Sequence, residues 1–330
     1  MLLPKPFLPA LWRAAAALVT PSTPLLAQVV VIRRCNLACG YCNEYDDFSK
    51  PVPRSELERR IDHLAEAGTV VLTFTGGEPL LHPELDALIR YAVSKGMVCT
   101  SITNGYTLTE RWIERLNEAG LTILQVSIDN LEPNEMSEKS WNTLKGRLEL
   151  LATHARFKVT VNAVLGSCSS AETREVVQGV KELGFYMTIG LMHDDKGQLS
   201  PGLLGDELAA FYEEVRGNSR KSLVHRAGEG WERLIIRDGI ADWKCRAGAR
   251  YLYVDEFGMV SYCSQRRGEP GTPLLEYTKA DREREFYVRK GCEESCTISC
   301  VRRASAFDSM RHQTAAHHKT SDGARSTYLH

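Results

Sequence analysis

The segment Cys35-Asn36-Leu37-Ala38-Cys39-Gly40-Tyr41-Cys42 follows the hydrophobic run Val29–Ile32. Three thiolates so close together can bind one metal centre, but a closed iron-sulfur or zinc site takes four ligands. An iron atom left without a protein thiolate is open to a small molecule, so the segment indicates a reactive cluster. A zinc knuckle or a redox-active thiol pair is the alternative, because Cys-x2-Cys is common in zinc sites.

The chain from Gln28 to about Met192 alternates strand-like and helix-like runs, as six successive βα units. Alternation of this kind requires parallel strands joined by right-handed crossovers. We therefore predict an α/β fold, a partial (βα)6 TIM-like barrel, with function on the loops at the carboxyl ends of the strands. The strand candidates, short and rich in Val, Ile and Thr, are Gln28–Arg33, Thr69–Thr75, Met97–Thr103, Thr122–Ile128, Phe157–Leu165 and Phe185–Leu191.

Local signals mark the ends of the predicted helices. Thr109 and Ser170 are expected as N-caps of two of them. A glycine stands where each of several helices would stop, and these glycines are Gly68, Gly96, Gly120 and Gly184.

The loop after the second predicted strand reads Thr75-Gly76-Gly77-Glu78-Pro79-Leu80. Two glycines let the backbone approach a ligand closely, and Glu78 can accept hydrogen bonds from an ammonium group. A tight turn without chemistry is the alternative for this segment.

Cys-x3-Cys-x2-Cys with an aromatic residue before the third cysteine resembles the signature of the radical S-adenosylmethionine (SAM) superfamily, and Gly76–Pro79 matches that family's SAM-binding segment letter for letter. The resemblance implies a 4Fe-4S cluster on Cys35, Cys39 and Cys42, whose open iron is chelated by SAM. It implies SAM contacts from Tyr41 near the adenine, from Gly76, Gly77, Glu78 and Pro79, and from Ser127 and Asp129 at the end of the fourth strand. Asn104 is a further candidate, with a simple turn as its alternative. The sequence leaves open whether Asn162, a weaker candidate, points into the barrel.

A second group of cysteines lies near the carboxyl end of the chain. Cys245 is followed by twelve residues, Gly258, four residues and Cys263, with a predicted β-hairpin between the cysteines. This spacing resembles the SPASM and twitch extensions, small Cys-rich α+β units that carry auxiliary 4Fe-4S clusters. The resemblance implies one auxiliary cluster, with a structural zinc as the alternative, and five candidate ligands: Cys245, Cys263, Cys292, Cys296 and Cys300.

The last three of these cysteines recur at every fourth residue. On one continuous helix they would span more than a single cluster can use. We therefore expect one of the three to lie off the cluster, or the helix to break. Cys99 and Cys168, on or just after predicted strands, are expected to pack as small apolar side chains.

The 330 residues, with 43% hydrophobic and 25% charged residues, suffice for a large domain with a smaller extension. We expect an N-terminal apolar helix in 1–27, the core in 28–195, a linker with one helix (Glu207–Arg216) in 196–240, the auxiliary-cluster unit in 241–310 and a disordered tail in 311–330. The apolar stretch Phe7–Val19 is too short to span a bilayer. It either packs on the domain or makes peripheral contact with a membrane surface.

Composition and resemblance together define the expected function. A formal net charge of -1 gives no support for a nucleic-acid partner, and ten clustered cysteines favour metal ligation in a reducing, cytoplasmic setting. The resemblance implies an enzyme that cleaves SAM reductively and modifies a peptide or natural product, with a one-electron donor such as flavodoxin or ferredoxin as partner. Adenosyl transfer or a related radical step on an isoprenoid or lipid is one alternative, and a non-catalytic zinc- or cluster-binding scaffold or redox sensor is another. No residue is nominated as a catalytic acid, base or radical relay.

Overall fold

The computed structural model describes residues 7–194, 196–200, 202–217 and 231–308. The predicted disordered tail, 311–330, lies outside these residues. The helices and strands that build the barrel and its extension are α1 (Phe7–Val19), β1 (Leu26–Ile32), α2 (Arg54–Glu66), β2 (Val71–Gly76), α3 (Leu85–Ser94), β3 (Val98–Thr103), α4 (Glu110–Ala119), β4 (Ile123–Ser127), α5 (Trp141–His154), β5 (Lys158–Leu165), α6 (Ser170–Glu182), β6 (Tyr186–Leu191), α7 (Asp206–Gly217), α9 (Trp231–Asp238), β7 (Tyr251–Val254), β8 (Met259–Ser261), β9 (Pro270–Pro273), α10 (Lys279–Tyr287) and α11 (Ser299–Ala306).

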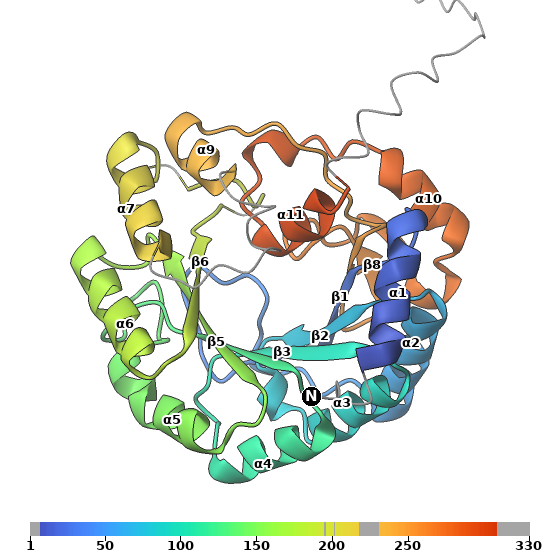
Figure 1. The fold of residues 1–330 in the computed structure, drawn as a ribbon, viewed down its shortest axis with the longest axis horizontal. Helices are drawn as coiled ribbons and strands as arrows, with labels where there is room; N and C mark the ends of the chain where they lie inside the picture. The colour runs from blue at the N-terminus through green and yellow to red at the C-terminus, as the bar shows by residue number, and fades with distance from the viewer. Residues whose placement is uncertain (1–6, 195, 201, 218–230, 309–330) are drawn as a thin grey trace, which may run out of the picture.

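Six parallel strands form the curved core, and Figure 1 shows helices α2 to α6 around its outside. The strand order is β6-β5-β4-β3-β2-β1-β7-β8-β9, so β6 and β1 do not pair and the barrel stays open between them. The partial (βα)6 barrel is confirmed, and each of the six predicted strands overlaps an observed one. In Figure 1, α11 lies over the open side between β6 and β1.

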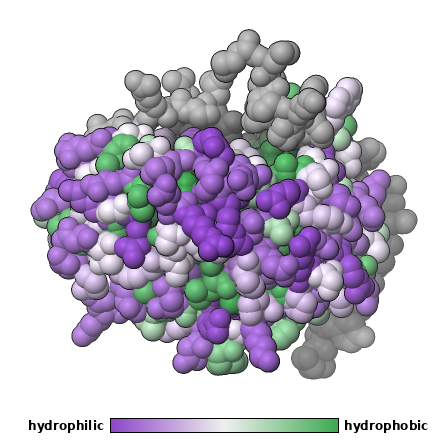
Figure 2. Space-filling model, turned by 90° about the horizontal axis from the view of Figure 1, so that it is seen from below, coloured by the Kyte–Doolittle hydropathy of each residue, from purple (hydrophilic) through white to green (hydrophobic). Residues whose placement is uncertain are grey.

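The interior of the barrel wall is apolar, as the sequence periodicity predicts. On α2, Leu57, Ile61 and Leu64 are almost completely buried, in line with their spacing of four and three residues. Burial of each such side chain stabilises the fold by about 1.5–3 kcal/mol. The outer face is mainly hydrophilic: Figure 2 shows the molecule from below, with apolar side chains in small separate groups.

Two of the predicted helix ends can be checked atom by atom. The Thr109 hydroxyl caps α4 by accepting a hydrogen bond from the Trp112 amide at 3.2 Å, and α4 ends at Gly120 with φ of 81°. The prediction of Ser170 as the cap of α6 is wrong by one residue, since Ser169 is the N-cap. Ser169 forms reciprocal hydrogen bonds with Glu172, three residues on, and only the earlier serine has a glutamate at that spacing.

The C-terminal hairpin continues the barrel sheet. β7 pairs in parallel with β1, Leu26 opposite Tyr251, and β8 returns antiparallel to β7 as predicted. The pairing with β1 covers the edge strand of the barrel, an edge that would otherwise present unpaired backbone groups. The sequence does not predict this pairing, because the two strands are far apart along the chain.

The predicted linker contains more helix than expected. The predicted helix Glu207–Arg216 overlaps α7, and α9 is an additional helix. Trp231, Ile235 and Ile236 of α9 are buried. The boundaries of the five predicted segments remain predictions.

The N-terminal helix α1 is fixed to the barrel by one side chain. The Arg13 guanidinium donates to the carbonyls of Ala65 (2.8 Å), Thr69 (3.3 Å) and Lys95 (2.9 Å), which lie at or just after the ends of α2 and α3. The side chain of Trp12 is 76% exposed, so part of the helix surface remains available to solvent. Among the described residues, no helix is long and apolar enough to cross a membrane.

Arg250 ties both ends of the described chain to the start of β7. Its fully buried guanidinium makes two hydrogen bonds with the Asp308 carboxylate, at 2.7 and 2.9 Å. The same group donates to the carbonyls of Ala17, Thr20 and Thr23, so all five of its N–H donors are used.

We expect Arg250→Met to lower the free energy of unfolding by about 3–5 kcal/mol, because the change leaves the buried Asp308 carboxylate without its guanidinium. Urea unfolding followed by far-UV circular dichroism measures the effect. Arg174→Met is the matched control, since Arg174 pairs with Glu214 on the surface, where an ion pair contributes about 0–1 kcal/mol. Equal losses in the two variants would contradict this assignment.

Candidate active site at the carboxyl ends of the strands

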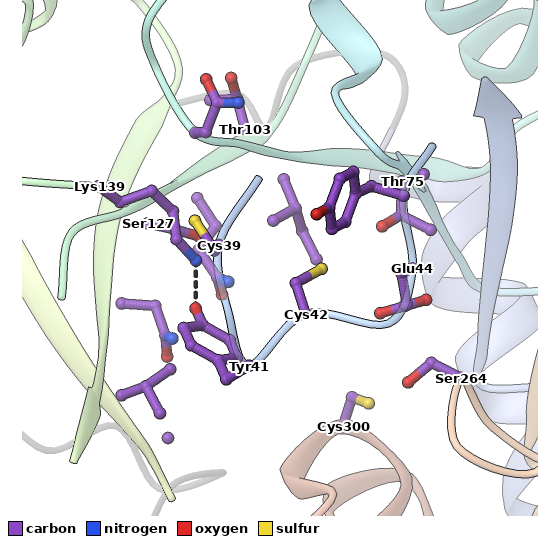
Figure 3. A pocket seen from close by; sticks show the side chains of 18 of the residues that line it. Cys39, Tyr41, Cys42, Glu44, Thr75, Thr103, Ser127, Lys139, Ser264 and Cys300 are labelled. Atoms are coloured by element: carbon purple, nitrogen blue, oxygen red, sulfur yellow. Dashed lines mark hydrogen bonds between the residues drawn. The ribbon is translucent and has the colours of Figure 1, made fainter. Parts of the chain in front are cut away.

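A cavity of about 340 Å³ opens at the carboxyl ends of the barrel strands. All three cysteines of the segment 35–42 line it, and Figure 3 shows two of them, Cys39 and Cys42. The structure brings them together with six of the predicted SAM-contact residues, which are Tyr41, Gly76, Gly77, Pro79, Asn104 and Ser127, and with Cys300, a predicted ligand of the auxiliary cluster. Asn162 also lines the cavity and therefore points into the barrel.

The cysteine loop is held against the segment that follows β4. The Ala38 amide donates to the Glu138 carboxylate at 2.7 Å. Gly40 lies so close to this segment that a Cβ there would come within 2.6 Å of the Glu135 carbonyl oxygen. Any side chain at position 40 would therefore force the two loops apart.

All three thiols accept N–H hydrogen bonds, that of Cys42 from the Glu44 backbone amide. The Leu37 amide and the Asn104 side chain donate to Cys35 Sγ at 3.4 and 3.5 Å, and the Glu138 amide donates to Cys39 Sγ at 3.4 Å. Burial nevertheless raises the pKa of Cys35 to about 11, so without a metal this thiol keeps its proton at neutral pH. Binding of a metal centre would release it, as ligation of iron by cysteine requires the thiolate.

The three thiols of the trio line one cavity and form a donor set that suits an iron-sulfur cluster. In the part of the chain that the structure describes, no three His, Cys, Asp or Glu side chains converge closely enough to hold one metal ion. A closed zinc site would need four ligands around a single ion. In an iron-sulfur cluster each thiolate binds a different iron atom, so three thiols that face one cavity from separate positions suit it.

Tyr41, Lys139 and Asp129 form a buried network beside the cavity. The Tyr41 hydroxyl donates to Asp129 at 2.8 Å, Lys139 Nζ lies 3.0 Å from the same carboxylate, and Lys139 also donates to Tyr41 (Figure 3). Burial lowers the pKa of Lys139, but the charge of Asp129 and the hydrogen bond to Tyr41 outweigh it and the pKa is raised overall. Lys139 thus remains a cation, and it lines the cavity.

Asp129 itself does not line the cavity. Its fully engaged carboxylate also accepts hydrogen bonds from the Ser137 hydroxyl at 2.7 Å and the Val164 amide at 3.1 Å. Direct contact between Asp129 and SAM therefore stays a prediction, and the role visible in the structure is to hold Tyr41 and Lys139 in place.

The Glu78 carboxylate, like that of Asp129, is engaged by hydrogen bonds from other parts of the protein. Glu78 is completely buried, and its carboxylate accepts hydrogen bonds from the Leu80 amide, the Thr103 hydroxyl and the Asn104 amide at 2.7–2.9 Å. Burial raises its pKa to about 7. Glu78 thereby links the loop after β2 to the end of β3, and contact with a SAM ammonium group stays a prediction. The Asn104 side chain closes a turn at Tyr106, as its alternative role predicts, and it also donates to Cys35; its contact with SAM stays a prediction.

The side of the cavity remote from the β2 and β3 loops comes from the C-terminal region. Ser264, Ser299, Cys300 and Arg303 all line it, and Figure 3 shows Cys300 and Ser264 facing the gap below Cys42. The sequence gives no signal for Ser264, Ser299 and Arg303 as site residues, because only the folded sheet brings them to the barrel mouth.

Two more residues at the mouth were not predicted as site residues. Glu44 lies two residues after the cysteine trio and accepts a hydrogen bond from the Tyr253 hydroxyl at 2.6 Å. His193, in the loop after β6, also lines the cavity.

The segment that contains Cys292, Cys296 and Cys300 is not one continuous helix, in line with one of the two expectations. A short 3-10 turn, Glu293–Ser295, separates Cys292 from Cys296, and Cys300 is in the first turn of α11. Burial raises the pKa of Cys296, and the neighbouring thiols of Cys245, Cys263 and Cys292 raise it further. These four thiols therefore lie near one another.

Comparison with known proteins bears directly on this site. The family model described as the Radical SAM superfamily matches residues 29–195. An AdoMet-dependent heme synthase of Methanosarcina barkeri is 31% identical over 194 residues, which cover 54% of this chain and 55% of that protein. A PqqA peptide cyclase of Bradyrhizobium diazoefficiens is 28% identical over 162 residues, covering 47% of this chain and 43% of that protein. The chain thus spans about half the length of these curated relatives.

Solved structures share the fold. Streptococcus suis SuiB bound to S-adenosylmethionine superimposes with a TM-score of 0.62 at 17% identity, covering 88% of this chain and 74% of SuiB. The protein anSMEcpe with bound AdoMet and the Kp18Cys peptide gives a TM-score of 0.56 at 17% identity, covering 82% of this chain and 86% of that one.

The close packing of Gly77 leads to a testable expectation. A Cβ at this position would lie 2.2 Å from the Arg33 carbonyl oxygen and 2.5 Å from that of Arg34. Gly77→Ala should therefore cost about 1–3 kcal/mol of stability and weaken SAM binding about tenfold or more as the loop shifts. Isothermal titration with SAM under anaerobic conditions measures the affinity.

Gly146→Ala is the control for this variant. Gly146 lies in α5, where an added Cβ would meet nothing within 4 Å, so the change should leave SAM affinity unchanged and add up to about 1 kcal/mol of stability. An unaltered affinity in the Gly77 variant would show that the loop does not need this close approach.

Proposed function

The chain belongs to the radical SAM superfamily, and on this premise we propose that it cleaves SAM reductively and uses the resulting radical to modify a peptide. The observation that carries the proposal is that the three cysteines of segment 35–42 share one cavity with Gly76, Gly77 and Pro79. In this proposal Cys35, Cys39 and Cys42 hold a 4Fe-4S cluster. When bound, that cluster supplies the electron that splits the carbon-sulfur bond of SAM to methionine and a 5′-deoxyadenosyl radical.

The protein's own groups would bind and orient SAM. Gly76 and Gly77 let the backbone come close to the methionine part, and Asn104 and Ser127 offer polar side chains along the cavity. Tyr41, fixed by Asp129, would border the adenine. A cavity enclosed by loops also limits the access of water to the radical.

The lining of the C-terminal side supports a peptide as substrate. Ser264, Ser299 and Arg303 present hydrogen-bonding groups there, and a peptide offers amide donors and acceptors that would match them. The comparisons also support a peptide substrate, since the similar proteins include a PqqA peptide cyclase and SuiB bound to precursor peptide SuiA.

The remaining parts of the proposal concern the auxiliary cluster, the electron donor and the cellular location. The C-terminal cysteines would hold one auxiliary 4Fe-4S cluster, and a flavodoxin or ferredoxin would deliver electrons one at a time. Such chemistry suits a reducing cytoplasm. The exposed surface of α1, including Trp12, would allow peripheral contact with a membrane.

We expect Cys39→Ala to abolish the formation of 5′-deoxyadenosine from SAM in reconstituted, reduced protein. The loss should remove about four irons and leave about four in the C-terminal centre, because the two groups of cysteines are separate. Chromatography of the nucleoside and an iron assay on the same samples measure both effects.

Cys99→Ala is the matched control, since Cys99 is fully buried in β3 away from the cavity. This variant should keep wild-type iron and activity. Continued 5′-deoxyadenosine formation by the Cys39 variant would refute the assignment of the trio, and colourless wild-type protein that binds zinc would favour a scaffold.

A further inference from the structure

One of the five C-terminal thiols differs from the others in its surroundings. Cys300 lines the cavity that also contains Cys35, Cys39 and Cys42, whereas Cys245, Cys263, Cys292 and Cys296 do not. In Figure 3 the Cys300 side chain stands on α11, on the side of the gap opposite Cys42. A thiol in this position faces the space in which SAM and a substrate would meet.

The other four thiols are sufficient for a cluster of their own. Cys245 and Cys296 each have the thiols of Cys263 and Cys292 among their titratable neighbours. Cys263 in turn has both Cys300 and Cys292 as neighbours. An iron-sulfur cluster with no open iron takes four thiolates, so one of the five is left over, and Cys300 is the one that lines the cavity of the cysteine trio.

Cys300 is also held by polar groups that do not belong to the cysteine group. Its side chain is a hydrogen-bond partner of the Tyr251 hydroxyl, which donates to Gln28 at 2.6 Å. Gln28 and Arg303, one turn further along α11, line the same cavity. These contacts fix the Cys300 thiol at the cavity wall. A cysteine that served only for packing would instead lie in the apolar interior.

We propose that Cys300 is a hydrogen-atom donor of the active site and not a ligand of the C-terminal centre. The proposal rests on the proposed function, because it needs a carbon radical in the cavity. The S–H bond of Cys300 breaks and a C–H bond forms on the radical carbon, which leaves a sulfur-centred radical on Cys300. One electron from the one-electron donor that the reaction already uses, and one proton from solvent, restore the thiol.

The chemistry of the S–H bond makes the proposal testable without the natural substrate. An S–H bond is weaker than the C–H bond that forms, whereas the O–H bond of water is too strong to give its hydrogen atom to a carbon radical. Thiol hydrogens exchange with solvent. In D2O, the 5′-deoxyadenosyl radical formed without substrate should therefore take deuterium from Cys300.

The experiment uses the full chain, reconstituted with iron and sulfide, with SAM and titanium(III) citrate in D2O and no added thiol. We expect wild-type protein to yield 5′-deoxyadenosine that carries one deuterium, and Cys300→Ser to lose this label. Serine preserves the hydrogen bond to Tyr251 but offers only an O–H bond. Cys168→Ser, whose thiol lies outside the cavity, should behave like wild type, and a retained label in the Cys300 variant would overturn the proposal.

Two further measurements separate this proposal from the proposed function. Cys300→Ser should keep the wild-type iron content, whereas Cys263→Ser should lose iron from the C-terminal centre; equal losses would make Cys300 a ligand. Anaerobic alkylation with iodoacetamide at alkaline pH, needed because burial raises the pKa of Cys300, should modify Cys300 in the iron-loaded protein and spare Cys245, Cys263, Cys292 and Cys296. Protection of Cys300 would overturn the assignment even in a protein that forms no 5′-deoxyadenosine, an outcome that by itself would count against the proposed function.

Discussion

The buried carboxylate of Asp129 is the interaction on which the geometry of the cavity depends. It receives hydrogen bonds from Tyr41 on the cysteine loop, from Ser137 and from the backbone of β5, and it pairs with Lys139. Removal of one partner from such a buried pair leaves an uncompensated charge and is strongly destabilising. The network of protein side chains therefore fixes the position of the cysteine loop without any contribution from a cofactor. The cost of burying the charges is offset only while all the partners stay together, so the network favours one loop arrangement.

The C-terminal region completes a barrel that six strands leave open. β7 extends the sheet beyond β1, and on the other side the Thr297 amide donates to the Gly197 carbonyl at 2.9 Å, close to β6. The same region thus contacts both sides of the opening. Because α11 begins just after Thr297, its first turn is directed to the cavity, and the residues that close the barrel also line the active site.

The sequence predicts those parts of the molecule that depend on local pattern. A stretch of about ten residues is enough to predict a buried strand, a helix stop such as Gly120 or the cysteine trio. The misplaced cap at Ser170 shows the limit even there, since the choice between two adjacent serines depends on Glu172. Contacts between distant loops are not readable: Lys139 and Glu138 follow β4 in sequence and have no motif, yet they hold the cysteine loop. Glu78 and Asp129 are recognisable as site residues, but their many protein donors become visible only in the structure.

The two sides of the cavity are built by different physical means, and this bears on how such a site can serve different substrates. The side around Gly76 and Gly77 depends on backbone proximity, because a Cβ at either glycine would collide with backbone atoms of the β1 segment. The opposite side is composed of side chains on the C-terminal region, such as Ser299 and Arg303, that can change without moving the backbone. Substitutions on the glycine side would disturb SAM and the fold together. Substitutions on the side-chain side would alter which substrate fits while the cysteine loop stays in place, so the division of the cavity separates the common chemistry from the choice of substrate.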